Sequence, residues 1–231
     1  MYKTHVHTDG LTGNLITLLL QGDFKSCLAF GVQVVHSVDD LQQFNLKVIC
    51  PALYKLGELW KFGKITVAEE HQATDLVKRI MIVLHARFVN PVVTRGKVIV
   101  SASPNEHHEI GARMVADFLE IDGWEVVYLG ANIPSGALLD LLKRKSPFLL
   151  ALSATSELSL VAVRSIIEVV RADPNIRATR IMVGGYAFNN SKLLQWHQIG
   201  ADGYAVDATG AVRMAAEWWS ERTPALIKSE E

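Results

Sequence analysis

Two acidic and two histidine side chains stand together in the segment Glu106-His107-His108-Glu109. A metal-binding histidine commonly donates its second ring N–H to a carboxylate, which fixes the tautomer and orients the ring. Glu106 precedes His108 by two residues and is suited to be that carboxylate. Gly111, three residues after His108, would let a bulky ligand approach the backbone closely. The alternative is a surface histidine that caps the start of a helix.

The position of this segment favours a ligand site. It follows the apolar run 97–102, which reads as a buried strand, and it precedes a stretch with helical periodicity over about 108–121. In open α/β sheets, ligands bind outside the carboxyl ends of the strands. The segment is therefore expected to reach into such a crevice.

The chain after Asn90-Pro91 alternates short apolar runs with helical patterns. This alternation predicts a doubly wound parallel sheet, a Rossmann-like or flavodoxin-like α/β domain over residues 94–231. The expected strands are 97–102, 125–129, 148–153, 180–183 and 203–205, and the expected helices are 108–121, 134–145, 159–172, 191–198 and 210–221.

The first 90 residues show helical periodicity and no alternation of strand type. Gly22-Asp23 and Asp39-Asp40 are expected to break the helices. Thr66, with Glu69 three residues later, has the spacing of a capping box at the start of a long last helix. Short connections between four helices predict an antiparallel four-helix bundle over residues 1–90.

Composition excludes several classes of function. The chain has 231 residues, of which 49% are apolar and 20% charged, and a formal net charge of −1, so nothing favours nucleic-acid binding. No run of about 18 uncharged apolar residues is present to cross a membrane, and the first residues lack a signal-peptide pattern. The two cysteines are too few for a disulfide framework or a zinc site. We therefore expect a cytoplasmic protein.

Three motifs stand at the ends of expected strands at fixed distances. The sequence reads Glu106-x-His108-x-x-Gly111, then 41 residues, Ser153-x-Thr155, then 28 residues, and Gly184-Gly185. This resembles the cobalamin-binding signature Asp-x-His-x-x-Gly, Ser-x-Leu/Thr and Gly-Gly, with its spacings kept. The departure is Glu106 in place of the usual aspartate, whose longer arm changes the reach between carboxylate and histidine.

The resemblance implies a role for each matching residue. His108 would be the lower cobalt ligand and Glu106 its partner. Ser159 would donate a hydrogen bond to the carboxylate, as a serine does in methionine synthases. The cofactor's nucleotide tail would insert into the fold and contact Ser153, Thr155, Gly184 and Gly185, with Tyr204 and Asp207 at the rim of its pocket. His107, Ile110 and Gly111 are also expected to contact the cofactor.

A second constellation lies in the predicted bundle, where Trp60 is followed after nine residues by Glu70-His71. On its own this pattern fits a core tryptophan beside a polar helix face. Before a cobalamin domain it resembles the cobalamin-dependent photoreceptors of the carotenoid-regulator type. That likeness implies that Trp60, Val67, Glu70 and His71 line the pocket of the upper cobalt ligand. It also implies adenosylcobalamin as the cofactor, with methylcobalamin and hydroxocobalamin as alternatives.

Two departures from those photoreceptors affect the expectation. Lys61 stands where they have a histidine that ligates cobalt after illumination, so His71 becomes the candidate for that ligand. No basic recognition helix precedes residue 14, so direct DNA binding is not expected.

We therefore expect a cobalamin-binding light sensor, not an enzyme, that takes part in signal transduction or transcription regulation through a protein partner or its own assembly. The alternative from another class is a corrinoid carrier protein of a methyltransferase system. A bulky Trp60 over cobalt disfavours it, because it would obstruct methyl delivery. A third possibility is a passive cobalamin store.

Overall fold

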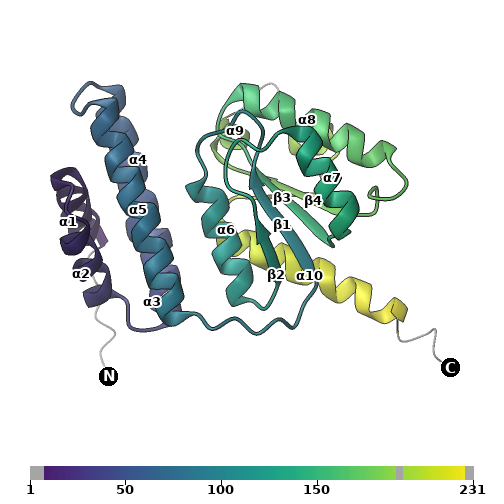
Figure 1. Ribbon diagram of the computed structural model, residues 1–231, viewed down its shortest axis with the longest axis horizontal. Coiled ribbons are helices and arrows are strands. Elements are labelled where there is room, and N and C mark those ends of the chain that lie inside the picture. The colour runs from purple at the N-terminus through teal and green to yellow at the C-terminus, as the bar shows by residue number, and fades with distance from the viewer. Residues whose placement is uncertain (1–7, 191–194, 227–231) are drawn as a thin grey trace. The chain divides into compact units, whose positions relative to one another are not determined.

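The computed structural model describes residues 8–190 and 195–226 of the chain. By its contacts the chain separates into two compact units, residues 1–90 and residues 91–231. The first unit is helical and the second contains the sheet (Figure 1). Each unit is described by itself below.

Helices make up the described part of the first unit. Helix α3, the π-helical segment η1 and helix α4 follow one another without leaving helical dihedral angles, so they act as one long interrupted helix. Together with the other helices they form a four-helix arrangement around a core of leucine and isoleucine side chains. The bounds are α1 Thr8–Gln21, α2 Phe24–Val34, α3 Val38–Phe44, η1 Asn45–Ile49, α4 Cys50–Lys61 and α5 Val67–Phe88.

The helix boundaries follow local capping chemistry. Asp39 and Asp40 lie in the first turn of α3, where their negative charges interact favourably with the helix dipole. They therefore belong to the start of this helix, and the expectation that they break a helix is wrong. The Asp40 N–H donates to Ser37 Oγ at 3.1 Å, which caps the helix. The capping box predicted at the start of α5 is confirmed, because the Thr66 N–H donates to Glu69 Oε2 at 2.7 Å and the Glu69 N–H donates to Thr66 Oγ1 at 3.2 Å.

The second unit is built on a five-stranded parallel sheet with the order β2-β1-β3-β4-β5. This is a doubly wound order of the flavodoxin type, and the predicted fold class is confirmed. The apolar runs located the strands closely. Their bounds are β1 Lys97–Ala102, β2 Glu125–Tyr128, β3 Leu149–Ser153, β4 Arg180–Gly184 and β5 Gly203–Ala205.

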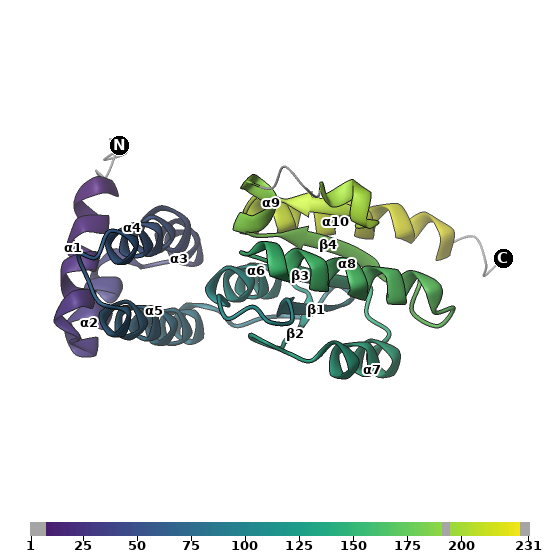
Figure 2. The same ribbon diagram turned by 90° about the horizontal axis from the view of Figure 1, so that it is seen from above.

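Helices cover both faces of this sheet (Figure 2). Alternate residues of one strand point to opposite faces, so Val98 and Val100 pack with helices α6 (Ile110–Ile121) and α10 (Ala208–Leu226). Ile99 of the same strand packs with helices α7 (Ser135–Lys145) and α8 (Glu157–Ala172). The two apolar layers hold the strands in register and fix where their carboxyl ends lie.

One expected helix is placed differently. Residues 191–198 were expected to be helical, but residues 191–194 lie outside the described part of the chain, and the flanking segments are the short helix α9 Tyr186–Asn190 and the 3₁₀-helix η2 Trp196–Ile199. Helix α9 starts directly after Gly185, whose φ of +100° turns the chain sharply. The Ala187 N–H then donates to the Ala154 carbonyl at 3.1 Å, which ties α9 to the loop after β3.

Among the described residues, we find no helix with the length and apolar character needed to cross a membrane.

Gly185 provides a test of this turn. A Cβ at this position would lie 2.3 Å from the Ala154 carbonyl oxygen, and its φ of +100° disfavours any L side chain. We expect Gly185→Ala to lower the free energy of unfolding by roughly 1–3 kcal/mol or more. Gly136→Ala is the matched control, because its added Cβ meets nothing within 4 Å. Thermal unfolding of both variants measures the difference, and equal melting temperatures would contradict the steric argument.

Candidate functional site

The three motifs of the sequence meet at one edge of the sheet. Ala102, the last residue of β1, pairs with Ser153 at the end of β3, and Ser153 pairs with Gly184 at the end of β4. Because parallel strands that end in register place their following loops side by side, the segments after these strands lie next to one another. The sheet register therefore brings together residues that are far apart in sequence.

Glu106 is the centre of the hydrogen bonds at this edge. It is only 2% exposed. Its Oε1 accepts from the His108 backbone N–H at 2.9 Å and from His108 Nδ1 at 2.6 Å. Its Oε2 accepts from the Thr155 N–H at 2.8 Å, from the Thr155 hydroxyl, and from the Ser159 hydroxyl at 2.8 Å. The longer glutamate arm thus reaches His108, Thr155 and Ser159 at once.

These hydrogen bonds keep Glu106 ionised. Burial alone would raise the pKa of this carboxyl group, but the hydrogen bonds from His108 and Thr155 outweigh burial and hold the pKa well below its ordinary value of 4.5. An ionised carboxylate only accepts hydrogen bonds. His108 Nδ1 must therefore carry the proton in this pair.

The tautomer decides what His108 can do. With the proton on Nδ1, the lone pair of a neutral imidazole is on Nε2, and that nitrogen can bind a metal. The His108 side chain is 76% exposed, whereas the Glu106 side chain that orients it is 3% exposed. A fixed ring that projects from a buried anion has the donor chemistry of a metal ligand with its orienting carboxylate. His108 lies before α6, whose first turn it does not cap.

Thr155 has a partner that the sequence did not predict. The resemblance implies contact with the cofactor's tail, and the structure adds that its backbone N–H and its hydroxyl both donate to Glu106. Its hydroxyl oxygen also lies 3.1 Å from His108 Nδ1, where it can accept from the ring N–H. Thr155 is therefore part of the group that orients His108.

The glycines of the motifs differ in the space that the fold leaves for a Cβ atom. Gly111 is exposed, and an added Cβ would meet only Ser153 Oγ, at 3.8 Å. A Cβ at Gly184 would lie 2.9 Å from the Ala205 carbonyl oxygen, and one at Gly185 would overlap the Ala154 carbonyl oxygen. The fold itself requires the two neighbouring glycines, whereas Gly111 leaves open surface beside His108 that a bulky ligand can occupy.

The other residues predicted to contact the cofactor differ in their burial and in their partners within the protein. His107 is exposed, while Ile110 is buried at the start of α6. Asp207 Oδ1 accepts from the Gly210 N–H at 2.7 Å, so this carboxylate caps α10. The ring of Tyr204 packs against Phe188 with centroids 6.0 Å apart. One carboxylate oxygen of Asp207 therefore has a structural role at the start of α10.

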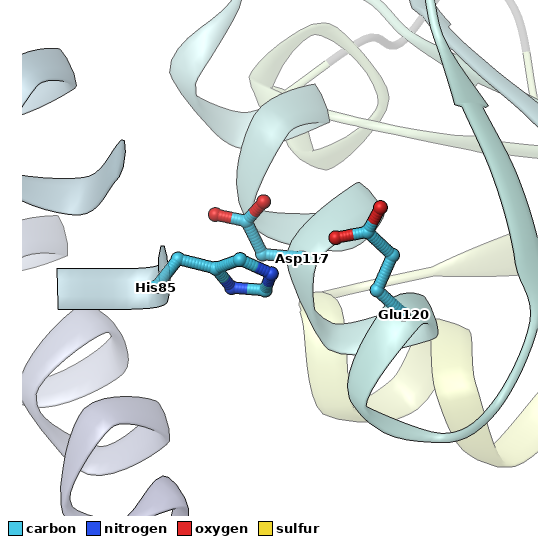
Figure 3. A group of neighbouring side chains, drawn as sticks. All are labelled: His85, Asp117 and Glu120. Carbon is cyan, nitrogen blue, oxygen red and sulfur yellow. The ribbon is translucent and has the colours of Figure 1, made fainter. Parts of the chain in front are cut away.

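Several polar residues near this edge carried no sequence motif. Tyr128 donates from its hydroxyl to Glu109 Oε2 at 3.3 Å, and burial, with Glu109 nearby, raises the pKa of this tyrosine. On α6 the Arg113 Nε donates to Asp117 Oδ1 at 2.7 Å. Figure 3 shows Asp117 and Glu120 projecting from the same side of this helix. The Arg113–Asp117 pair has the i, i+4 spacing of a helix and can be read from the sequence, whereas the contact of Tyr128 with Glu109 joins two elements and cannot.

The helical unit carries the second constellation. Trp60 is near the end of α4, and Glu70 and His71 lie in the first turns of α5, so the short connection 62–66 keeps them at one end of this unit. Trp60 is 49% exposed and Val67 is 51% exposed. Glu70 Oε2 lies 2.7 Å from His71 Nδ1, and Glu70 Oε1 accepts from the Thr74 hydroxyl at 2.8 Å. This end of the unit is an exposed surface with apolar and titratable groups.

Comparisons with known proteins agree with this geometry. Residues 96–213, more than half of the chain, match the B12 binding domain, and residues 13–85 match a second B12 binding domain. The chain belongs to the B12-binding domain family. Cobalamin is therefore the cofactor class that fits the exposed imidazole, its buried carboxylate and the open surface at Gly111.

Individual relatives extend over both units. Dimethylamine corrinoid protein 2 of Methanosarcina acetivorans is 25% identical over 196 residues, which covers 84% of this chain and 89% of the relative. The monomethylamine corrinoid protein of Methanosarcina barkeri has the same fold, with a TM-score of 0.75 and 18% identity over 91% of this chain and 99% of that chain. The repressor CarH of Myxococcus xanthus is 32% identical, but over only 45% of this chain and 33% of its own length.

These relatives overturn the expected function. Proteins that match across most of the chain are named as corrinoid proteins, whereas the likeness to the transcriptional repressor CarH is confined to 104 residues. The expectation of a light sensor is wrong. A match of 196 residues is longer than the whole second unit, so it must extend into the helical unit that contains Trp60. The likeness to corrinoid proteins therefore includes part of the helical unit, so the presence of this unit does not distinguish a sensor from a carrier.

The ionised Glu106 predicts how stability depends on pH. Because its pKa is lowered on folding, its contribution is complete above the unfolded value of about 4.5 and is lost as the pH falls from there toward the folded value. We expect the cofactor-free protein to lose unfolding free energy below about pH 4.5. Glu106→Gln should be less stable at pH 7, by on the order of 2 kcal/mol, with a flatter pH dependence.

Glu168→Gln is the control for this experiment, because Glu168 forms an exposed pair with Arg164 at 2.8 Å that should contribute little. Chemical unfolding at a series of pH values measures both variants. Parallel pH profiles for wild type and Glu106→Gln would contradict an ionised, buried Glu106.

Proposed function

We propose that this protein is a methyl carrier that uses a bound corrinoid and passes the methyl group between partner methyltransferases. The observation that supports a corrinoid site is the exposed His108 ring, held at Nδ1 by the buried carboxylate of Glu106 at 2.6 Å. The relatives that match most of the chain, which are named as dimethylamine corrinoid proteins, support the carrier role. In this role the protein itself holds the group, and its partners catalyse the transfers.

The chain's own residues would prepare the lower side of the cofactor. Glu106 keeps the proton on Nδ1 and so directs the lone pair of Nε2 to the metal, while Thr155 and Ser159 hold the carboxylate in place. Bound cobalamin would supply a cobalt centre that accepts a methyl group and gives it up. The charge of Glu106 makes His108 a more basic ligand, which stabilises the state in which the imidazole is bound.

The remaining residues would bind the cofactor at its edges. We assign Ser153, Gly184 and Gly185 to the nucleotide tail, because they lie where β3 and β4 end in register. The exposed end of the helical unit, with Trp60, Val67, Glu70 and His71, would contact the upper side. Methylcobalamin replaces the expected adenosylcobalamin as the working form, and the methyl donor is a small methylated compound such as a methylated amine. The protein partner is then a methyltransferase.

His108 is tested by the spectrum of the protein loaded with cobalamin. His108→Ala should shift the visible spectrum from the imidazole-ligated form to the base-off or water-ligated form, because the lower nitrogen ligand is lost. His36→Ala is the control, since His36 is an exposed histidine outside the motifs of the site. The spectrum of this control should equal that of wild type. An unchanged spectrum in His108→Ala would remove the assignment.

The carrier role needs a second measurement. Protein-bound cobalamin is reduced and treated with isotopically labelled methyl iodide, and the labelled protein is then exposed to a thiol acceptor and a purified methylamine-type methyltransferase pair. A carrier takes up label and returns it to the thiol. A protein that ligates cobalamin through His108 but neither accepts nor returns a methyl group is not a carrier.

Gly111 separates binding from folding. Gly111→Ala adds a methyl group that the chain has room for, and replacing glycine within helix α6 reduces the entropy of the unfolded chain. We expect the melting temperature of the cofactor-free variant to stay or to rise, while its Kd for cobalamin rises about tenfold because the methyl group occupies the cofactor's surface. Calorimetric titration measures the Kd. Equal affinity would show that the cofactor does not lie against Gly111.

A further inference from the structure

Two asparagines at this edge have an uncommon backbone conformation. Asn105 has a φ of 60° and Asn132 a φ of 54°, both in the left-handed region. Asparagine tolerates this region better than most residues, because its short polar side chain can bond locally. Asn105 directly precedes Glu106, and Asn132 lies in the loop between β2 and α7. Two such residues in neighbouring loops indicate a specific contact rather than a chance turn.

The contact is reciprocal. The Asn105 backbone N–H donates to Asn132 Oδ1 at 3.1 Å, and the Asn132 backbone N–H donates to the Glu106 carbonyl at 3.0 Å. The β2–α7 loop therefore holds the backbone on both sides of the bond between Asn105 and Glu106. The left-handed conformation of Asn132 lets a single residue offer its side-chain oxygen and its own N–H to the same short segment.

This backbone contact complements the contacts of the carboxylate. Thr155 and Ser159 hold the Glu106 side chain from the loop and helix that follow β3. Those bonds fix the carboxylate. The main chain at this point is held by separate bonds, in which the Glu106 N–H donates to the Ser103 carbonyl at 3.1 Å and the Asn132 N–H donates to the Glu106 carbonyl at 3.0 Å. His108 follows two residues later, so its ring direction depends on that main chain as well.

We propose that Asn132 is a positioning residue for His108, which it orients through the backbone of Asn105 and Glu106. This rests on the proposed function, because its consequence is the fraction of cobalamin that His108 ligates. The side chain's contribution is the acceptor Oδ1, and the tolerance of a positive φ is a separate requirement. Substitutions that remove the acceptor but keep the positive φ, or keep both, test whether the side chain of Asn132 orients His108.

Three variants make that separation. Asn132→Gly keeps the left-handed conformation and the N–H to Glu106, but it removes the acceptor for Asn105. Asn132→Asp keeps an acceptor at the same place. Asn105→Gly is the matched control, because it keeps both its left-handed conformation and the backbone N–H that donates to Asn132.

The first measurement uses the cofactor-free protein. Amide hydrogen exchange of Asn105, followed by NMR, should be slow in wild type and in Asn132→Asp, because the N–H is bonded. It should be several-fold faster in Asn132→Gly. Melting temperatures of all variants should stay close to that of wild type, since the affected hydrogen bond is at the surface. An unchanged exchange rate in Asn132→Gly would show that Asn132 Oδ1 does not hold the Asn105 N–H, and it would overturn the proposal.

The second measurement is spectroscopic. With cobalamin bound, Asn132→Gly should lower the equilibrium constant between His108-ligated and base-off forms about three- to tenfold, the range expected for one lost hydrogen bond. Asn132→Asp should restore it, and Asn105→Gly should leave it unchanged. A merely structural role would lower the melting temperature and leave this ratio unchanged.

The outcomes are distinguishable. If wild type ligates cobalamin through His108 and Asn132→Gly has the same ratio, the positioning role is overturned and the proposed function stands. If wild type never shows His108 ligation, the proposed function fails, and the positioning role fails with it, whatever the exchange rates are.

Discussion

A buried negative charge is the constraint on which this site depends. Glu106 is 2% exposed and ionised, and an unpaired carboxylate in such surroundings would cost several kcal/mol. The structure supplies donors from His108, Thr155 and Ser159. None of these donors can move far without leaving the charge unsatisfied. The charge therefore fixes the tautomer of His108 and also ties together loops that are distant in sequence.

The strand order explains why those loops are available. In the order β2-β1-β3-β4-β5, β1 has β2 on one side and β3 on the other. The segment after β1 is thus flanked by the loop after β3, which holds the Glu106 carboxylate, and by the loop after β2, which holds the Glu106 backbone through Asn132. Ala102 and Ser153 are paired at the ends of their strands, so the segment after β1 and the loop after β3 begin close together. Orientation of one exposed imidazole is consequently a property of three strands and not of one motif.

The sequence predicted much of this and missed the parts that depend on distant neighbours. Apolar runs located the strands, and the spacing of the motifs identified Glu106, His108 and Ser159. It could not show that Thr155 bonds to Glu106, because that depends on how the loop between β3 and α8 lies against the segment after β1. It also missed helix α9, which starts where Gly185 passes close to the Ala154 carbonyl. Asn132 stands in no motif, and only the hydrogen bonds reveal it.

The glycines explain why a signature that identified the family led to the wrong function. Gly184 and Gly185 are required because the backbone of another segment approaches them closely. Their presence in the signature therefore indicates the fold and not the reaction. In the proposed site, Gly111 and His108 would face the lower side of the cofactor, where a sensor and a carrier would need the same ligand. The residues proposed for the upper side, Trp60 and His71 among them, belong to the helical unit, into which the match to a dimethylamine corrinoid protein also extends. A motif that satisfies the fold and the lower ligand therefore constrains the family strongly and the reaction only weakly.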